Sequence, residues 1–255
     1  MVRILSVGTL LSCAEFLSQP SLLKNDGLMS WEIGRLRQPW LAKGWLGATL
    51  NSVLSYPNVI WLLVIRMSVA MLMLLGPADL ITKSWLILIA TVLCWFFVMR
   101  SSYGQDGADQ MAYIIYLALA VSSLAGATLV FLWFIALQSC LAYCVAGIAK
   151  ARSKGWRDGD YLIDVCYTHI YGHAGFADFL FCRRRLAKLL ARTLIVWESS
   201  FPLVLLMPAP VALGVLAGGV LFHLANAYLM GLNTFFWSFL TTYPAILYCV
   251  KTRGW

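Results

Sequence analysis

Long apolar segments separated by short polar stretches recur along almost the whole chain, and no other feature constrains its fold as strongly. Most of them approach the roughly 20 residues that an α-helix needs to cross a bilayer. Hydrophobic types make up 61% of the 255 residues and charged types 12%, whereas about a quarter of a soluble domain is charged. Because so few charges could not cover a soluble core, the sequence predicts an all-α, polytopic transmembrane helix bundle.

The apolar segments predict eight membrane helices, with seven as the alternative count. Residues 110–149 are too long for one crossing, and Ser122, Ser123 and Gly126 offer a break between two helices. We interpret the first apolar run as a membrane helix, with a cleaved signal segment as the alternative. The predicted helices cover residues 1–18, 57–75, 85–99, two parts of 110–149, 186–207, 211–229 and 233–250.

Two polar segments, residues 19–45 and 151–185, interrupt this pattern. No internal repeat is apparent, and we expect residues 1–255 to form a single transmembrane domain. The net charge is +8, and the basic residues lie mostly between the apolar spans. This distribution fits anionic membrane lipids as the partner rather than nucleic acid.

Polar side chains inside membrane helices are the first candidates for function, because they are costly in hydrocarbon and usually face an interior. Glu198 lies in the middle of a predicted span beside Pro202, where either a functional or a structural role is open. Lys150 stands where an apolar helix meets the polar segment 151–185. It is either an interfacial anchor or, if desolvated, a base.

A stripe of side chains recurs at steps of three and four residues near the end of the chain. If one helix continued through Gly231, the stripe would occupy one face of it. Such a face either lines a cavity or joins helices by hydrogen bonds. The stripe comprises His223, Asn226, Met230, Asn233 and Trp237.

Metal binding is not predicted. His169 and His173 share a possible helix face, but no third ligand accompanies them. The glycine-rich loop that contains Asp106 and Asp109 is too short for a calcium-binding hand, and we interpret it as the rim of a cavity. The seven cysteines show no paired zinc spacing, and we interpret them as structural.

Three blocks of sequence carry a pattern of one family of membrane proteins. Residues 143–150 read Tyr-Cys-Val-Ala-Gly-Ile-Ala-Lys, with Trp156 and Gly159 downstream. A His-x-x-Asn motif follows at 223–226, with Pro244 beyond it, and polar glycine loops lie at 25–27 and 103–107. Together these blocks resemble the HTTM family, which includes the membrane domain of vitamin K-dependent gamma-carboxylase and its bacterial relatives.

The resemblance implies a membrane enzyme of the carboxylase or epoxidase type that modifies a peptide or small substrate. It implies Lys150 as the catalytic base, with His223 and Asn226 orienting a reacting oxygen. The cofactor it implies is a quinol, similar to vitamin K or menaquinol, and no metal. The residues expected to line the substrate cavity are Asp106, Asp109, Trp156, Glu198 and Asn233.

Two departures from the family keep an alternative open. No histidine occurs near Asp109, and the carboxylase's large extramembrane domain has no counterpart in these residues. The alternative is a non-catalytic accessory subunit for the maturation or export of a small secreted peptide, similar to the SdpB-like proteins. Either reading implies a multi-pass protein of the bacterial inner (plasma) membrane. Its orientation is open, because the positive-inside rule and the family resemblance favour opposite sides for Lys150.

Overall fold

The computed structural model describes residues 1–27, 29–37, 43–76, 79–100, 107–168 and 172–253. Within these residues the regular structure is helical throughout and contains no strand. A helix satisfies its own backbone hydrogen bonds, which an apolar segment in lipid requires. The all-α prediction is confirmed. The chain divides into two compact units, Met1–Phe131 and Leu132–Trp255, and a single domain over all 255 residues stays a prediction.

Six helices within the described ranges are long and apolar enough to cross a membrane. Much of their surface consists of exposed apolar side chains, such as Leu72, Val130 and Leu221, which fit contact with lipid. The chain is therefore a multi-pass membrane protein. The six are α4 (Asn58–Leu75), α5 (Leu80–Arg100), α6 (Gly107–Ala125), α7 (Thr128–Arg152), α11 (Arg184–Ser200) continued by the 3-10 helix η4 (Phe201–Leu206), and α12 (Ala209–Met230).

The predicted count of eight membrane helices is corrected to six for the part of the chain described. The other two segments are helical at the predicted places, as α1 (Val2–Ser18) and α13 (Asn233–Thr252). However, α1 has only 17 residues, and α13 carries many hydroxyl and amide groups, which lower its hydropathy. The predicted break between α6 and α7 is confirmed at Gly126, whose φ is +66°.

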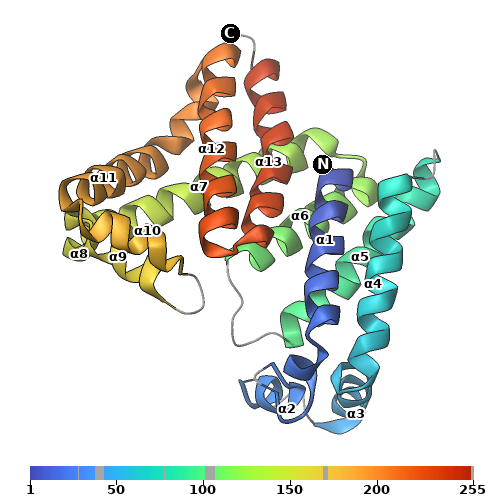
Figure 1. Cartoon of the computed structure of the whole chain (residues 1–255). Helices are drawn as coiled ribbons and strands as arrows, with labels where there is room; N and C mark the ends of the chain where they lie inside the picture. The colour runs from blue at the N-terminus through green and yellow to red at the C-terminus, as the bar shows by residue number, and fades with distance from the viewer. Residues whose placement is uncertain (28, 38–42, 77–78, 101–106, 169–171, 254–255) are drawn as a thin grey trace. The chain divides into compact units, whose positions relative to one another are not determined.

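In the first unit, α1 packs on α4, α4 on α5 and α5 on α6 (Figure 1). The polar segment 19–45 contains η1 (Pro20–Leu23), α2 (Trp31–Gly34), η2 (Arg35–Arg37) and the start of α3 (Gly44–Leu54). Arg100 is buried at the end of α5 and donates hydrogen bonds to the carbonyl oxygens of Leu54 and Leu23, at 3.0 and 2.9 Å. These bonds hold part of the polar segment against the bundle.

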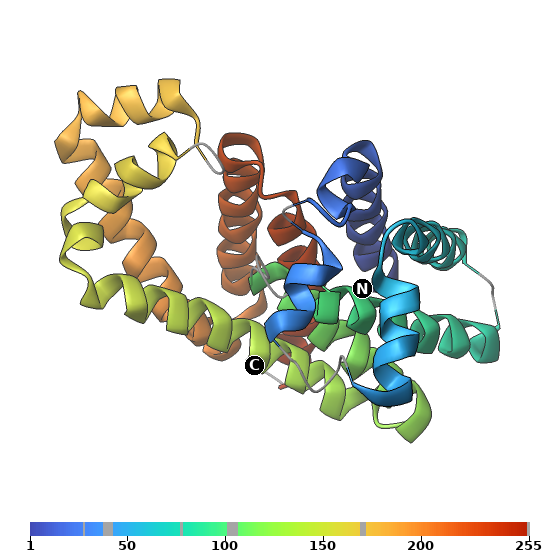
Figure 2. The ribbon, with the colours of Figure 1, turned by 90° about the horizontal axis from the view of Figure 1, so that it is seen from below.

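In the second unit, α12 and α13 lie side by side after a turn at Gly231 (Figure 1). Three short helices fill the predicted polar segment 151–185 and pack with the first part of α11 (Figure 2). We call α8 (Lys154–Asp158), α9 (Asp160–Tyr167) and α10 (Ala174–Phe181) the polar lobe. Its small core contains Ile163, Leu180 and Ala187 of α11.

Gly147 allows α7 and α11 to approach closely. A Cβ atom at Gly147 would lie 2.5 Å from the backbone nitrogen of Ser199 and 2.9 Å from Cβ of Glu198. Real Cβ atoms essentially never come so close to backbone, so any larger residue would push the two helices apart. The contact places Lys150, three residues further along α7, opposite α11.

We expect Gly147→Ala to destabilise the protein by about 1–3 kcal/mol, because the added methyl overpacks the contact between α7 and α11. The matched control is Gly214→Ala within α12, where an added Cβ would meet no atom within 4 Å. Alanine is the better helix former, so the control should be neutral or stabilising by about 0.5–1 kcal/mol. Unfolding in mixed detergent, followed by circular dichroism, measures both. Equal effects of the two substitutions would contradict the assigned role of Gly147.

Candidate functional site

A cavity of about 240 Å³ lies within the second unit, with walls from α7, α8, α9, α11, α12 and α13 and from Leu232. Most of its lining is apolar, and this volume approaches the small end of the range for small-molecule sites. Its polar or amphipathic lining consists of Tyr143, Lys150, Trp156, Glu198, His223 and Asn226.

The structure brings together five of the eight residues for which the sequence predicts a role. Five predicted residues from four helices line this one cavity: Lys150, Trp156, Glu198, His223 and Asn226. Such convergence of separated polar residues in an apolar pocket is typical of a ligand site.

Of the other three predicted residues, the structure describes two, and neither of these lines the cavity. Asn233 is exposed at the start of α13 and is not among the described residues that line the cavity. Asp109 lies in the first turn of α6, in the first unit. Asp106 lies outside the described residues.

Lys150 and Glu198 form an ion pair in which the carboxylate is buried and the lysine is half-buried. The Nζ atom of Lys150 donates to both carboxylate oxygens of Glu198, at 2.9 and 2.7 Å, and lies 5.4 Å from the ring centroid of Trp156. Glu198 is only 3% exposed. Both hydrogen bonds are donated by Nζ of Lys150, whereas the base predicted at this position must accept a proton.

A chain of three hydrogen-bonded side chains borders the same cavity. The Oη atom of Tyr143 lies 2.6 Å from Nε2 of His223 and 2.8 Å from Oη of Tyr243. His223 is 3% exposed, and its ring stacks on Phe239 with centroids 4.8 Å apart. Both the hydrogen bond and the stacking fix the orientation of the imidazole.

The Nδ1 atom of His223 is buried and has no hydrogen-bond partner in the part of the chain described. If Tyr143 donates to Nε2, then Nδ1 carries a hydrogen and is an unsatisfied donor. If Nε2 donates to Tyr143, then Nδ1 is an unsatisfied acceptor. A buried polar atom without a partner is costly, so either tautomer favours a ligand that can hydrogen bond at this atom.

The sequence interpretation missed Tyr143 and Tyr243 as site residues. Tyr143 lies seven residues before Lys150, two helical turns or about 10.5 Å along the same face of α7, and this spacing could have indicated it. Tyr243 reaches Tyr143 because Gly219 on α12 leaves room for its hydroxyl group. No local signal in the sequence marks that contact.

The stripe predicted on one helix face is only half correct. The helix ends at Met230, because Gly231 has a φ of +67° and begins the turn to α13. His223, Asn226 and Met230 line the cavity as a shared face of α12. Asn233 and Trp237 belong to the next helix, so they do not continue that face.

The paired histidines of the sequence do not form a metal site in the described residues. His173 caps α10, and its Nδ1 atom accepts a hydrogen bond from the backbone of Phe176 at 3.1 Å. His169 lies outside the described residues. No group of three or more His, Cys, Asp or Glu residues within the described ranges is placed to hold a metal ion.

Comparison with known proteins yields no relative: the chain matches no protein-family model, no curated protein and no solved structure. The resemblance to the HTTM family therefore stays a prediction.

We expect Lys150→Met to destabilise the protein by about 3–5 kcal/mol, because it leaves the Glu198 carboxylate buried without its partner. The double variant Lys150→Met with Glu198→Gln removes both charges and should be more stable than Lys150→Met alone. Unfolding free energies of the wild type, both single variants and the double variant give the coupling. Lys188→Met is the control, since its partner Asp158 lies in a more exposed pair and should tolerate the loss. If the effects of the two single substitutions on the unfolding free energy simply add in the double variant, the two side chains are not coupled, which would contradict the ion pair.

Proposed function

We propose that this chain is an HTTM-type enzyme of the inner (plasma) membrane whose second unit binds a quinol-like molecule and exchanges protons with it. The observation that carries this proposal is the cavity itself, which joins apolar walls to two separate hydrogen-bonding systems. One is the Lys150–Glu198 pair and the other is the chain Tyr243–Tyr143–His223.

The residues present suit a flat, apolar molecule that carries a hydroxyl or carbonyl oxygen. Phe222, Phe235 and Phe239 supply aromatic wall surface, and His223 presents an Nδ1 atom without a partner. A quinol hydroxyl can both donate and accept, so it would satisfy either tautomer of this imidazole. When bound, a quinol supplies electrons and protons for a redox reaction.

Proton handling at the site rests on Lys150 and Glu198. Two charges in an apolar cavity lose hydration, which destabilises the ion pair. The free-energy difference between the ion pair and its neutral form, an amine beside a carboxylic acid, therefore becomes smaller. Transfer of one proton along the 2.7 Å hydrogen bond would give Lys150 the free amine that a base requires. Asn226 adds an amide on the same wall, suited to orienting a reacting oxygen.

The reaction proposed at this site, which rests on the resemblance to the HTTM family, is quinol-linked modification of a small secreted peptide or another small substrate. Exposed apolar side chains on the spans fit contact with membrane lipids, in which an apolar cofactor would concentrate. A non-catalytic accessory role in peptide maturation or export, as in the SdpB-like proteins, would need no proton transfer at Lys150. Measurements of quinone binding and of quinol oxidation therefore distinguish the enzyme from the accessory subunit.

The binding test uses menadione, a small naphthoquinone, titrated into the purified full-length protein in lipid nanodiscs. Quenching of tryptophan fluorescence reports occupancy, because Trp156 lines the cavity. We expect His223→Phe to weaken binding about 10-fold, since it keeps the ring but removes the hydrogen-bonding nitrogen. Ser139→Ala removes a buried hydroxyl that bonds Thr242 outside the cavity lining and should bind as the wild type does. Equal affinity in all three proteins would refute the site.

The turnover test measures oxidation of menadiol by the same preparations. Wild-type turnover in Lys150→Ala would exclude this lysine as the base. Menadione binding that depends on His223 but is accompanied by no menadiol oxidation in any variant would favour the accessory role.

A further inference from the structure

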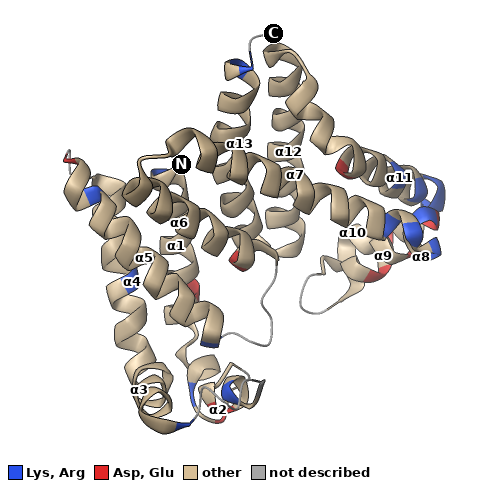
Figure 3. Cartoon of the chain, turned by 180° about the vertical axis from the view of Figure 1, so that it is seen from behind, with Lys and Arg blue, Asp and Glu red and all other residues tan. Residues whose placement is uncertain are grey.

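The most strongly charged part of the chain is the polar lobe with the residues beside it. Residues 150–192 contain nine Lys and Arg residues and only four Asp residues. In Figure 3 the ribbon segments coloured blue for Lys and Arg gather on α8 and the first half of α11, whereas most of each membrane span is tan. These cations form two sets: an inner set that bonds to α8 and α9, and an outer set that has no ion-pair partner in the described residues.

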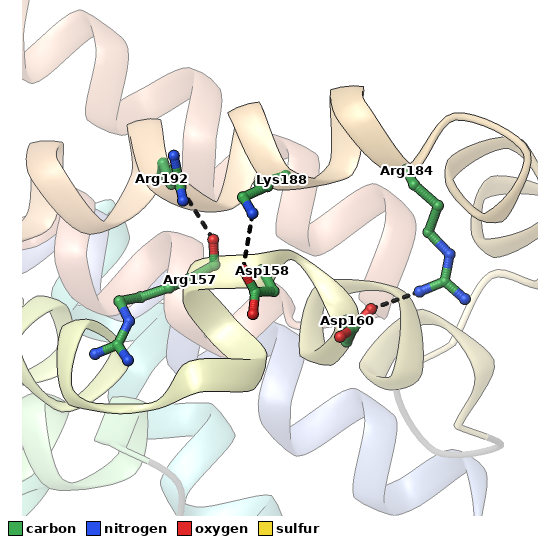
Figure 4. Close-up of polar contacts among 6 residues, drawn as sticks. All are labelled: Arg157, Asp158, Asp160, Arg184, Lys188 and Arg192. Carbon is green, nitrogen blue, oxygen red and sulfur yellow. Dashed lines mark hydrogen bonds and ion pairs between the residues drawn. The ribbon is translucent and has the colours of Figure 1, made fainter.

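The side chains of the inner set are all hydrogen-bonded within the unit. Lys188 donates to Asp158 at 2.8 Å, Arg184 pairs with Asp160, and Arg192 donates to the carbonyl oxygen of Arg157 at 3.1 Å (Figure 4). The three α11 cations are spaced by four residues, so they share one face that clamps α8 and α9. The hydrogen bond and charge of Lys188 lower the pKa of Asp158, so this clamp stays charged at neutral pH.

The outer set has no carboxylate partner in the described part of the chain. Its members are exposed, and none takes part in an ion pair there: Arg152, Lys154, Arg157, Arg183 and Arg185. Only two further acids lie in the lobe, and Asp178 already accepts a hydrogen bond from Tyr167. The outer set therefore presents an excess of positive charge that its own fold does not neutralise.

Exposed aromatic rings lie next to these cations. Arg183 lies over Phe179 at 4.2 Å from the ring centroid, and Phe179 is 42% exposed. Phe181, 51% exposed, carries Arg184 at 4.7 Å. Aromatic rings with one face against apolar surroundings and charged groups beside them are typical of the headgroup level of a membrane.

The covalent connections fix where the lobe lies. It follows directly on α7, which ends at Arg152, and precedes α11, which begins at Arg184. Both are candidate membrane spans. A short helical segment between two spans must lie at one surface of the bilayer, since about 30 residues with this many charges cannot enter the hydrocarbon core.

We infer that the polar lobe, together with the adjoining ends of α7 and α11, is a docking surface for anionic phospholipid headgroups of the cytoplasmic leaflet, because loops rich in Lys and Arg stay on the cytoplasmic side. The cations of the outer set complement the negative charge of these headgroups. The exposed rings of Phe179 and Phe181 suit the membrane interface, and the spans α7 and α11 hold the lobe at the bilayer surface. Trp156, Leu162 and Val165 of the same lobe line the cavity, so headgroup binding holds this wall of the cavity at that leaflet. The inference concerns the lobe's partner and its side of the membrane, and it holds whatever ligand the cavity takes.

The lipid test compares thermal unfolding of the full-length protein in nanodiscs of phosphatidylcholine with nanodiscs of equal parts phosphatidylcholine and phosphatidylglycerol. We expect the anionic lipid to raise the Tm of the wild type by about 5 °C at low salt, and less at high salt. The triple variant Lys154→Gln, Arg183→Gln and Arg185→Gln should lose most of this increment.

The matched control removes the same number of charges from the first unit, as Lys24→Gln, Lys43→Gln and Lys83→Gln, all of them exposed. It should keep the increment. The inference is overturned if both triple variants lose it equally or if the lobe variant keeps it. Stabilisation by soluble heparin but not by phosphatidylglycerol would also overturn it, in favour of a polyanionic macromolecule.

The side of the membrane is tested with Cys182, the one cysteine of the seven that is exposed. It lies directly after α10, in the lobe region. A membrane-impermeant maleimide should label it in inside-out vesicles and leave it unlabelled in intact cells, and Cys182→Ser should remove the signal. Labelling in intact cells would place the lobe outside and contradict the inference without affecting the menadione tests.

Discussion

A lysine and a glutamate among apolar helices persist as charges only while they neutralise each other, and this constraint fixes how α7 and α11 meet. Lys150 and Glu198 come within 2.7 Å because Gly147 lets the two backbones approach. If the two helices moved apart by the width of one residue, each charge would lose its partner among apolar side chains, where an unpaired charge is costly. The pair therefore holds the two helices in register, and that register places the rest of the cavity wall.

Small residues make the space that the polar groups border. On α7, Ala146 lies between Tyr143 of the hydrogen-bonded chain and Lys150 of the ion pair, Ala142 directly precedes Tyr143, and both alanines line the cavity. Gly219 on α12 makes equivalent room for Tyr243. Small residues alone would let membrane helices pack closely and close the cavity. The large rings of Phe222 on α12 and Phe239 on α13, which both contact His223, keep these helices apart at this level.

The sequence predicted the helices and five of the polar or amphipathic residues that line the cavity, because both follow from local patterns. Apolar length located the spans, and polar residues inside them pointed to Lys150, Glu198 and His223. Pairing was not predictable, since it depends on which helices pack together. Tyr143 was missed because a tyrosine in an apolar helix looks like ordinary core. The stripe failed beyond Met230 because a glycine can either continue a helix or end it, and here Gly231 ends it with a positive φ.

The polar lobe supplies one wall of the cavity from outside the membrane spans. Part of the cavity wall comes from α8 and α9, which are too short to span a bilayer, and the remainder comes from longer helices. Gly159, with a φ of +86°, lets the turn between those short helices pack against the backbone of Lys188. The wall is thus fastened to α11 both by exposed or half-buried charge pairs and by the small apolar core of Ile163, Leu180 and Ala187. Because this core is small and the charge pairs are accessible to water, local opening of the lobe wall should cost less free energy than opening of the helix bundle that holds Lys150 and Glu198.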